Sequence, residues 1–551
     1  MSQTQHIPVL IIGGGIVGLS ASLFLTQHSV RSLLVERHSS TSNHPRGRSV
    51  NTRTMEFYRS LGIDAAVRQA GATIAPSMGI LKGPSLASVM EKRPREEGTK
   101  EMPLAGLFSD QSPEKGQRVT QDELEPVLLR AAQERSGEVR FGVECLGVEQ
   151  DDSGVTAMLR DGETGETSVV KAEYCIAADG AGSPIRKQLG VKSRGQGTLG
   201  HMLNILFHAD LKAFVENREF SLCVVDHPEV RGLLTSINNS DRWVFHLCYD
   251  PAEGQKVEDF PEQRCVTLLR LALGMSELEI SIKSIMPWEP SAMFAEQLQH
   301  GRVFLAGDAA HQMTPYAGQG ANSGIADAHN LAWKLAAVLK GYAKPELLET
   351  YDVERDPVAK VAVEVSAVAA DERGNLAVSM SLGTAWAMAR RLYIISGFGY
   401  TYTSRAIVEE DTGPLGGITW RPWTLNSLLM SLDGRPGTRA PHVWVVQDGK
   451  RISTLDLFGK SFVLLAGPDG QSWKDAAKTV SSAIGVNLEA YCVGMNGDLV
   501  DAKDEFRAAA GISSRGALLV RPDGFVTWRE RRQPVDSQER LEKALKKTLC
   551  L

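Results

Sequence analysis

The sequence predicts an α/β protein in which a Rossmann-type nucleotide-binding domain is interleaved with a β-rich domain and followed by a thioredoxin-like C-terminal domain. Three observations predict this class. A strand–helix–strand pattern with a glycine-rich turn occupies residues 1–36, and two further glycine-punctuated segments lie at residues 178–183 and 307–322. Residues 441–551 alternate between strand-like and helix-like runs, which is typical of a separate small domain.

The first element is a short apolar run at residues 8–12, typical of a buried parallel strand. A GxGxxG turn and a helix follow, and residues 31–35 form a second strand that ends at Glu36. In this motif the first glycine allows the turn, the second lets the backbone approach a pyrophosphate, and the third lets helix and strand pack. Helix-start amides attract phosphates, and Glu36 can accept bonds from ribose hydroxyls, so we expect a dinucleotide. The motif residues are Gly13, Gly15, Ile16 and Gly18.

The third glycine segment favours a flavin over a nicotinamide. A strand at residues 303–306 leads to Asp308, which is placed to bind the ribityl hydroxyls of a flavin. The run at residues 318–322 then begins a helix that continues to residue 339. Amides at that helix start would face the pyrimidine edge of the isoalloxazine, where negative charge gathers on reduction. The sequence therefore predicts FAD, with this helix start formed by Gly318, Gly320, Ala321 and Asn322.

Composition excludes several other classes. The net charge is −6 and the pI is about 6.1, which does not favour nucleic-acid binding. The seven cysteines include no CxxC pair, which argues against a structural metal site or a disulfide framework and fits a reducing compartment. The apolar stretch at residues 7–25 is broken by glycines and hydroxyls, and no basic segment precedes it. We therefore expect a cytoplasmic protein with no membrane segment and no metal.

At the flavin motifs the chain resembles the group A flavin-dependent aromatic hydroxylases, the family with the p-hydroxybenzoate hydroxylase fold. Residues 307–322 and 327–335 are similar to the family's flavin motif. Asp179 and Gly180, within residues 178–186, resemble the second motif, which is associated with both FAD and NAD(P)H.

The resemblance extends over essentially the whole chain. Residues 44–56 resemble the segment that follows the ribose acid, and Gln121 resembles a flavin-contacting glutamine of the larger members. Residues 437–444 and 454–459 resemble the C-terminal domain of phenol hydroxylase-like and aromatic-polyketide hydroxylase-like members. Arg48 stands where phenol hydroxylase carries an acid, which argues against a close phenol hydroxylase role and is compatible with the polyketide-tailoring members.

The resemblance implies a monooxygenase that uses FAD, O₂ and NADPH or NADH to hydroxylate a small phenolic or polyketide-type aromatic through a flavin C4a-hydroperoxide. The protein must shield this species from water. Epoxidation or Baeyer–Villiger oxygenation of a related metabolite is the alternative. A flavin-dependent reductase and a non-catalytic flavin-binding protein are weaker ones. The tail implies a homodimer.

Candidate residues follow from the motifs and from the strands of the β-rich region. For catalysis we expect Pro315 at the reacting flavin edge, Arg48 and His311, with His246 as a second histidine that could tune a phenol. Arg46 or Arg48 could stabilise a pyrophosphate, NADPH or a substrate oxyanion, or could form a surface ion pair. Flavin binding also involves Arg37 and Arg46. The expected substrate wall, which could equally be core, contains Leu203, Ile205, Phe245, Tyr316 and Trp288.

The resulting domain plan has five parts. Residues 1–190 form the first part of the FAD-binding domain, with a loop-rich insert at about 80–116, and residues 191–290 form the β-rich substrate domain. Residues 291–412 complete the FAD-binding domain with helices, 413–440 form a linker, and 441–551 form the thioredoxin-like domain. That last domain lacks CxxC, so we expect no thiol redox chemistry from it.

Overall fold

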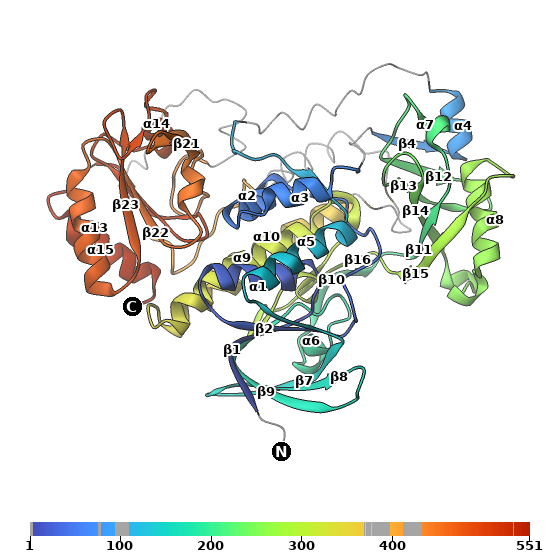
Figure 1. Ribbon diagram of the computed structural model, residues 1–551, viewed down its shortest axis with the longest axis horizontal. Coiled ribbons are helices and arrows are strands. Elements are labelled where there is room, and N and C mark those ends of the chain that lie inside the picture. The colour runs from blue at the N-terminus through green and yellow to red at the C-terminus, as the bar shows by residue number, and fades with distance from the viewer. Residues whose placement is uncertain are drawn as a thin grey trace.

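A computed structural model describes residues 4–74, 79–93, 110–368, 370, 376, 397–410, 432–532 and 534–551. Figure 1 shows three regions: a central body of sheet and long helices, a β-rich middle domain on one side, and the C-terminal domain on the other. This is the mixed α/β architecture that the sequence predicts. Within the described residues, no helix is long and apolar enough to cross a membrane.

The body is organised around the parallel strand β1 (Gln5–Ile12), whose last four residues are buried. It pairs in parallel with β2 (Ser32–Glu36) and β9 (Thr167–Ala177), and the sheet continues to β6 (Glu138–Phe141) and β18 (Val303–Leu305). Because these strands run in the same direction, their carboxyl ends lie at one edge of the sheet. The three glycine segments, which follow β1, β9 and β18, therefore meet there.

Helices cover the sheet at that edge. Helix α1 (Ile16–Gln27) packs between α5 (Gln121–Glu134) and α9 (Gly320–Leu339), so it is buried over nearly its whole circumference. The remaining elements of the body are one long, largely buried helix and several shorter elements. They are β3 (Ser49–Val50), α2 (Thr52–Ser60), α3 (Asp64–Ala70), β5 (Gln117–Arg118), β7 (Val143–Asp151), β8 (Gly154–Asp161), α6 (Pro184–Gln188), β17 (Gln299–His300) and α10 (Thr350–Val368).

The middle domain is a six-stranded sheet with helices on one face. Its order is β15 (Ser281–Trp288), β11 (His201–His208), β14 (Arg242–Tyr249), β13 (Arg231–Ser236), β12 (Leu222–Asp226) and β4 (Ile80–Gly83). Helices α8 (Glu262–Leu273), α4 (Leu86–Glu91) and α7 (Lys212–Val215) lie beside it (Figure 1). A small sheet of β10 (Ser193–Thr198), β16 (Ser291–Ala295) and β19 (His311–Gln312) connects this domain to the body.

The predicted loop-rich insert at 80–116 is wrong for its first part. Residues 80–83 form β4, which pairs in parallel with β12 of the middle domain, and α4 follows with a capping box at Ser85. The strand lies at the sheet edge and alternates between exposed and half-buried residues, so it carries no strong apolar pattern. Residues 94–109 lie outside the described residues.

The C-terminal domain has the expected thioredoxin-like order. Strands β22 (Phe462–Ala466) and β23 (Leu488–Gly494) are parallel and are joined by α13 (Gln471–Ile484). Strands β25 and β26 then pair antiparallel next to β22, and α15 packs against α13. The other elements of this domain are β20 (Trp444–Gln447), β21 (Lys450–Ser453), β24 (Leu499–Val500), α14 (Glu505–Ala510), β25 (Ala517–Val520), β26 (Val526–Glu530) and α15 (Ser537–Thr548).

The segments between body and C-terminal domain differ from expectation in two places. Residues 397–410 contain no helix, although helices were expected to about residue 410. The end of the predicted linker at 413–440 is packed rather than free: Arg439 is fully buried and bridges to Phe525. The earlier part of that linker, residues 413–431, lies outside the described residues.

A buried charge network joins the C-terminal domain to the body. Glu354 on α10 accepts bonds from Lys334 on α9 (2.8 Å) and from both terminal nitrogens of Arg521 (2.7 and 3.0 Å). Arg521 also contacts Asp523 at 2.6 Å. Burial alone would raise the pKa of Glu354, but Arg521 and Lys334 bring it well below its usual range. The side chains of Glu354, Lys334 and Arg521 have no exposed surface, so each charge depends on the others.

We expect Arg521→Met to loosen the C-terminal domain, because it leaves the buried carboxylates of Glu354 and Asp523 without their shared cation. Breaking a buried pair in this way costs about 3–5 kcal/mol. The measurement is the urea midpoint of unfolding, followed by the fluorescence of the tryptophans. Arg405→Met is the matched control, because Arg405 pairs with Glu349 at the exposed surface, where a pair contributes about 0–1 kcal/mol. Equal midpoints for the two variants would contradict the assignment.

Candidate cofactor and substrate site

The first glycine segment divides into two structural glycines and one that faces open space. Gly13 has a φ of +108°, and a Cβ there would lie 2.2 Å from the carbonyl oxygen of Ala178. A Cβ on Gly18 would lie 1.9 Å from the carbonyl oxygen of Gly13. At Gly15, the residue before α1, the nearest atom to such a Cβ is Glu125 Oε1 at 3.5 Å. Gly15 and the half-buried Ile16 therefore border a hollow at the helix start.

Glu36 ends β2 beside this hollow, as predicted for the ribose-binding acid. Its Oε2 accepts from the amide of Gly14 at 2.7 Å, and its Oε1 accepts from the amide of His38 at 2.9 Å. A carboxylate has about four acceptor positions, so Glu36 retains capacity for hydroxyl donors. The neighbouring predicted residues Arg37 and Arg46 are exposed and make no ion pair among the described residues.

Gln121 opens α5 on the opposite wall of the hollow. Its Nε2 donates to Glu125 Oε1 at 2.6 Å, and its amide donates to the carbonyl oxygen of Arg46. Glu125 Oε2 accepts from the amide of Ser42 at 2.7 Å, and burial raises the pKa of this carboxyl. These bonds fix the segment around residues 42–46 against α5, which is how a segment without regular structure is held at the site.

The second glycine segment is arranged around Asp179. Its carboxylate accepts from Ser183 Oγ at 2.6 Å and from the amide of Ile185 at 3.1 Å, so it organises the start of α6. Burial raises the pKa of Asp179. Gly180 has a φ of +83°, a conformation that favours glycine. Both residues are half-buried at the edge where the strands end.

The third glycine segment presents Asp308 and an uncapped helix start. Asp308 is exposed, although enough protein surrounds it to raise the pKa of its carboxyl by desolvation, as expected for a group that lines a hollow. A Cβ on Gly320 would lie 3.9 Å from Asp308 Oδ1. Helix α9 begins at Gly320 with no side-chain cap and no acidic residue in its first turn, so its positive end is available to a ligand. Pro315 and Gly318, directly before it, are exposed.

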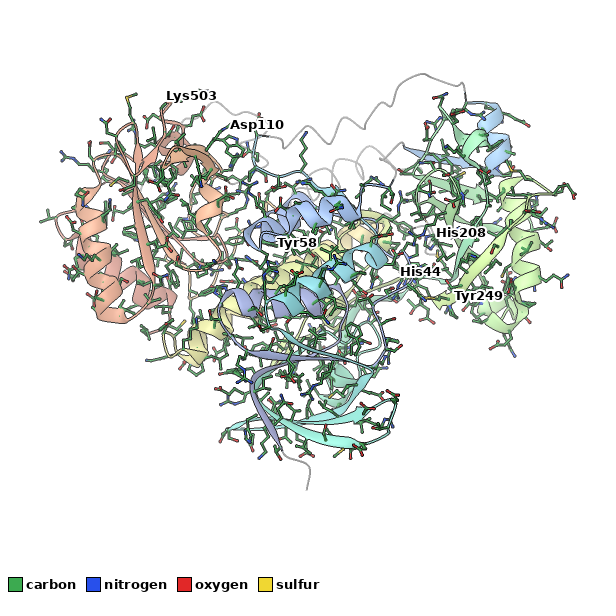
Figure 2. The ribbon with its side chains drawn as sticks, in the orientation of Figure 1. His44, Tyr58, Asp110, His208, Tyr249 and Lys503 are labelled. Carbon is green, nitrogen blue, oxygen red and sulfur yellow. The ribbon has the colours of Figure 1, made fainter. Side chains whose placement is uncertain are left out.

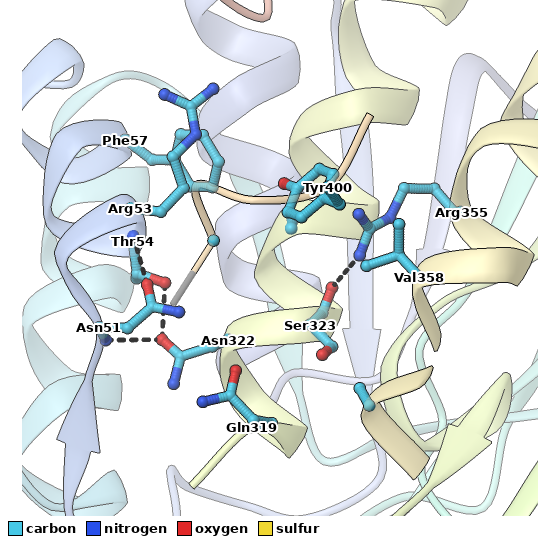
Figure 3. A pocket seen from close by; sticks show the side chains of 13 residues that line it. Asn51, Arg53, Thr54, Phe57, Gln319, Asn322, Ser323, Arg355, Val358 and Tyr400 are labelled. Atoms are coloured by element: carbon cyan, nitrogen blue, oxygen red, sulfur yellow. Dashed lines mark hydrogen bonds between the residues drawn. The ribbon is translucent and has the colours of Figure 1, made fainter. Parts of the chain in front are cut away.

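The side chain of Asn322 holds α9 to the start of α2. Its Oδ1 accepts from the amide of Asn51 at 2.8 Å and from Thr54 Oγ1 at 2.7 Å (Figure 3). Its Nδ2 donates to the carbonyl oxygen of Gly318 at 2.8 Å. The small cavity behind this contact has a volume of about 20 Å³, enough for about one water molecule. This cavity is therefore too small for a flavin or an aromatic substrate.

The predicted catalytic role of His311 is corrected by its surroundings. Its side chain has no exposed surface, and its Nε2 bonds Asp327 Oδ2 at 2.7 Å. Asp327 Oδ1 accepts from Arg355 Nε at 2.8 Å. Burial alone would raise the pKa of Asp327, but His311 and Arg355 lower it to about 2. His311 therefore holds the flavin segment together and does not reach a substrate.

The predicted substrate wall lies on two different faces of the six-stranded sheet. Leu203, Ile205 and Phe245 are fully buried in the core that the sheet forms with α8, so their assignment as substrate contacts is wrong. On the other face, the half-buried Trp288 has its ring 6.3 Å from that of His246. The half-buried Tyr316 packs against the apolar cluster of Val224 and Leu233 on this same face.

The residues on the second face were missed, apart from His246 and Trp288. Cross-strand register places Asn204, His246, Leu233 and Val224 in one row across β11, β14, β13 and β12. This face looks toward the body, because Arg242, four residues before His246, bonds Asp122 of α5. Side chains alternate between the two faces of a sheet along a strand, so His246 and its neighbour Phe245 point to opposite faces. This alternation was the signal that the sequence offered. The sequence did not show which face of the sheet α8 covers.

The geometry defines a dinucleotide-binding flavoprotein in which the middle sheet faces the segment directly before α9. Comparisons with known proteins agree. A family model described as an FAD binding domain matches residues 6–366, and one described as the C-terminal domain of aromatic-ring hydroxylases matches residues 433–550. The chain belongs to the FAD-binding aromatic-ring hydroxylases, and it is a flavin-dependent monooxygenase.

Three relatives illustrate the match. A Streptomyces halstedii protein named as a polyketide hydroxylase is 41% identical over 98% of this chain and 96% of its own length. The tetracenomycin A2 monooxygenase-dioxygenase of Streptomyces glaucescens is 38% identical over 100% of this chain and 98% of its own. The crystal structure of aklavinone-11 hydroxylase with FAD and aklavinone covers 100% of both chains, with a TM-score of 0.84 and 35% identity.

The residues present fit FAD. Open space in front of Gly15, acceptor capacity on Glu36 and an exposed Asp308 beside an uncapped helix start match the pyrophosphate, ribose and ribityl–isoalloxazine parts. When bound, FAD supplies the redox chemistry that activates dioxygen.

We expect Gly15→Ala to weaken FAD binding by about 10- to 100-fold, or about 1.4–2.8 kcal/mol, because the added methyl enters ligand space rather than protein. Equilibrium titration of the apoprotein by flavin fluorescence measures this. The urea midpoint of the apoprotein is the control and should be unchanged, since no protein atom lies within 3.4 Å of the new Cβ. Unchanged FAD affinity would show that Gly15 does not face the pyrophosphate.

Replacing an aromatic residue by alanine is expected to have different effects on the two faces of the middle sheet. Phe245→Ala should lower the free energy of unfolding by about 3–5 kcal/mol, because the ring is fully buried in the core. Trp288→Ala should cost less stability and instead raise the KM for an aromatic substrate, because that ring is half exposed beside His246. Urea unfolding and steady-state kinetics separate the two. A stable Phe245→Ala variant with a raised KM would reverse the assignment of the faces.

Proposed function

We propose that this enzyme hydroxylates a phenolic aromatic polyketide, using NADPH or NADH as the electron donor. The observation that carries the proposal is the wall opposite α9's first turn, which is apolar except for one polar row. Val224 and Leu233 form an apolar cluster with Tyr316, and Asn204 and His246 lie beside them. Such a wall suits a flat aromatic ligand with hydroxyl or carbonyl groups along one edge.

The relatives support the substrate class, because full-length proteins that are 35–41% identical to this chain include a named polyketide hydroxylase and a hydroxylase solved with aklavinone. The chain's own residues supply binding and shielding. Exclusion of water from the flavin face prevents unproductive loss of reducing equivalents as hydrogen peroxide. In this proposal the middle sheet, which packs against Tyr316 next to Pro315, excludes water from the flavin face.

The test measures reduction, oxygen uptake and product together. The FAD-loaded protein is mixed anaerobically with NADPH or NADH, and flavin bleaching is followed with and without a hydroxyanthraquinone. In air, we expect ligand-stimulated oxygen uptake and a product heavier by one oxygen atom. Oxygen-independent turnover would identify a reductase, and insertion of oxygen into a ring carbon–carbon bond would identify Baeyer–Villiger oxygenation. Either result would contradict the proposal.

A further inference from the structure

One polar row interrupts the apolar face of the middle sheet that looks toward the body. Asn204 on β11 and His246 on β14 are directly opposite each other in register, and their side chains bond through Asn204 Oδ1 and His246 Nδ1 at 2.5 Å. Leu233 and Met286 continue the same row on neighbouring strands. Polar groups in an apolar wall lose solvation, and Asn204 and His246 offset that loss in part by bonding each other.

The bond with Asn204 fixes which imidazole nitrogen is available. An amide oxygen only accepts, so Nδ1 carries the proton and Nε2 is left with a lone pair. No described group bonds Nε2. Burial, together with the nearby charges of His44 and Arg48, lowers the pKa of His246 to about 3. His246 is therefore neutral at physiological pH and offers an acceptor to a ligand hydroxyl.

Arg48 reaches from the body to the same sheet, and it lacks a counter-ion among the described residues. Its Nη1 donates to the carbonyl oxygen of Ser221 at 2.9 Å, just before β12, and its buried Nε has no partner. Burial and the neighbouring cation Arg118 lower the pKa of Arg48 to about 9. None of the described carboxylates pairs with it, whereas the buried Arg53, Arg355, Arg439 and Arg521 each contact one.

The charged groups around His246 and Arg48 are mostly cationic. His246 faces His44 and Arg48, and Arg48 faces Arg118 of β5. The carboxylate of Asp122 is engaged by Arg242. His44 is buried with both ring nitrogens unpartnered, and it lies where the body meets the middle domain in Figure 2. A desolvated cation with a vacant N–H is stabilised by an anionic oxygen.

We propose that Arg48 binds an ionised substrate hydroxyl, a phenolate or enolate oxygen, while Nε2 of His246 accepts a hydrogen bond from a second hydroxyl that keeps its proton. This rests on the proposed function and identifies its substrates as polyhydroxylated aromatics with one acidic hydroxyl. On binding, the O–H bond of the acidic hydroxyl breaks, its electron pair stays on oxygen, and the proton passes to solvent. The resulting anion donates electron density to the ring carbons ortho and para to it, where hydroxylation takes place.

The test uses the FAD-loaded protein without NAD(P)H, so that no turnover occurs. The probe is 1,8-dihydroxyanthraquinone, whose absorption band moves to longer wavelength on ionisation. We expect the pKa of the bound probe to lie at least about one unit below that of the free probe. Arg48→Met should abolish this shift, and Arg48→Lys should keep part of it. Arg194→Met, an exposed arginine on β10, is the control and should keep all of it.

The role of His246 is tested with a second probe, 1-hydroxyanthraquinone, which lacks the other hydroxyl. The wild-type protein should bind the dihydroxy probe about tenfold more tightly than the monohydroxy probe. His246→Phe should lose this preference while keeping the pKa shift of the bound probe. FAD absorbance reports whether each variant is folded.

Three results would overturn the proposal: a wild-type protein that leaves the probe's ionisation unchanged, an Arg48→Met variant that keeps the shift, or a His246→Phe variant that keeps the preference. Product analysis separates this failure from failure of the proposed function. Oxygenation of a probe that is bound un-ionised overturns the role of Arg48 alone. A wild-type protein with neither a spectral response nor oxygenation of any hydroxyanthraquinone contradicts both.

Discussion

The buried carboxylate of Asp327 is the interaction on which the flavin site depends. It stands on α9 and accepts from the amide of Gly307, from His311 Nε2 and from Arg355 Nε. Gly307 and His311 are the two ends of the turn that carries Asp308, and Arg355 belongs to α10. One side chain thus sets the distance between Asp308 and the first turn of α9. A buried charge without partners would cost several kcal/mol, so the three donors leave little freedom to this arrangement.

This explains why a histidine is present in a flavin motif without touching a ligand. A neutral or cationic imidazole donates to Asp327 while it fills space between the turn and α9, which a smaller donor would leave empty. The sequence correctly assigned His311 to the flavin segment, but the catalytic role predicted for it was wrong. The position of a residue in a motif indicates where it lies in the fold, whereas the exposure of its side chain determines which ligand groups it can contact.

The glycine motifs could be predicted because their causes are local. Gly13 and Gly18 are required by backbone atoms within the same strand–turn–helix unit, or on the strand paired to it, so the spacing of glycines carries the information. The same is true of Glu36, which ends the adjacent strand. Each of these residues is fixed by contacts that any copy of this supersecondary unit must make.

The substrate wall could not be predicted in this way, because its cause is distant. Both faces of the middle sheet are covered, one by α8 and the other by the body, so both carry apolar residues and neither shows a clean alternation. Leu203 and Asn204 are neighbours in the chain, so their side chains point to opposite faces of the sheet. Which of these two faces looks toward the body depends on the face that α8 covers. Helix α8 begins 58 residues after Asn204. Edge strand β4 was missed for a related reason, because its partner β12 is far along the chain.

No residue assigned to the cofactor or substrate site belongs to the described part of the C-terminal domain, yet the contacts of this domain reach α9. Asp523 accepts from Arg53 of α2 through its carbonyl oxygen at 2.8 Å. The residue before α2, Asn51, donates its amide to Asn322 in the first turn of α9 (Figure 3). On the far side of the same helix, Lys334 joins the network of Glu354 and Arg521.

Two polar chains therefore run from this domain to opposite ends of α9. An apolar interface of the same area would tolerate small sliding movements, since dispersion contacts have no direction. Charged groups buried on both sides do not tolerate them, because a shift of an ångström or two leaves a carboxylate unpaired. The domain thus fixes the position of α9 relative to the rest of the body. It thereby also fixes where the start of this helix lies relative to the flavin. A tail without catalytic groups can in this way be required for catalysis.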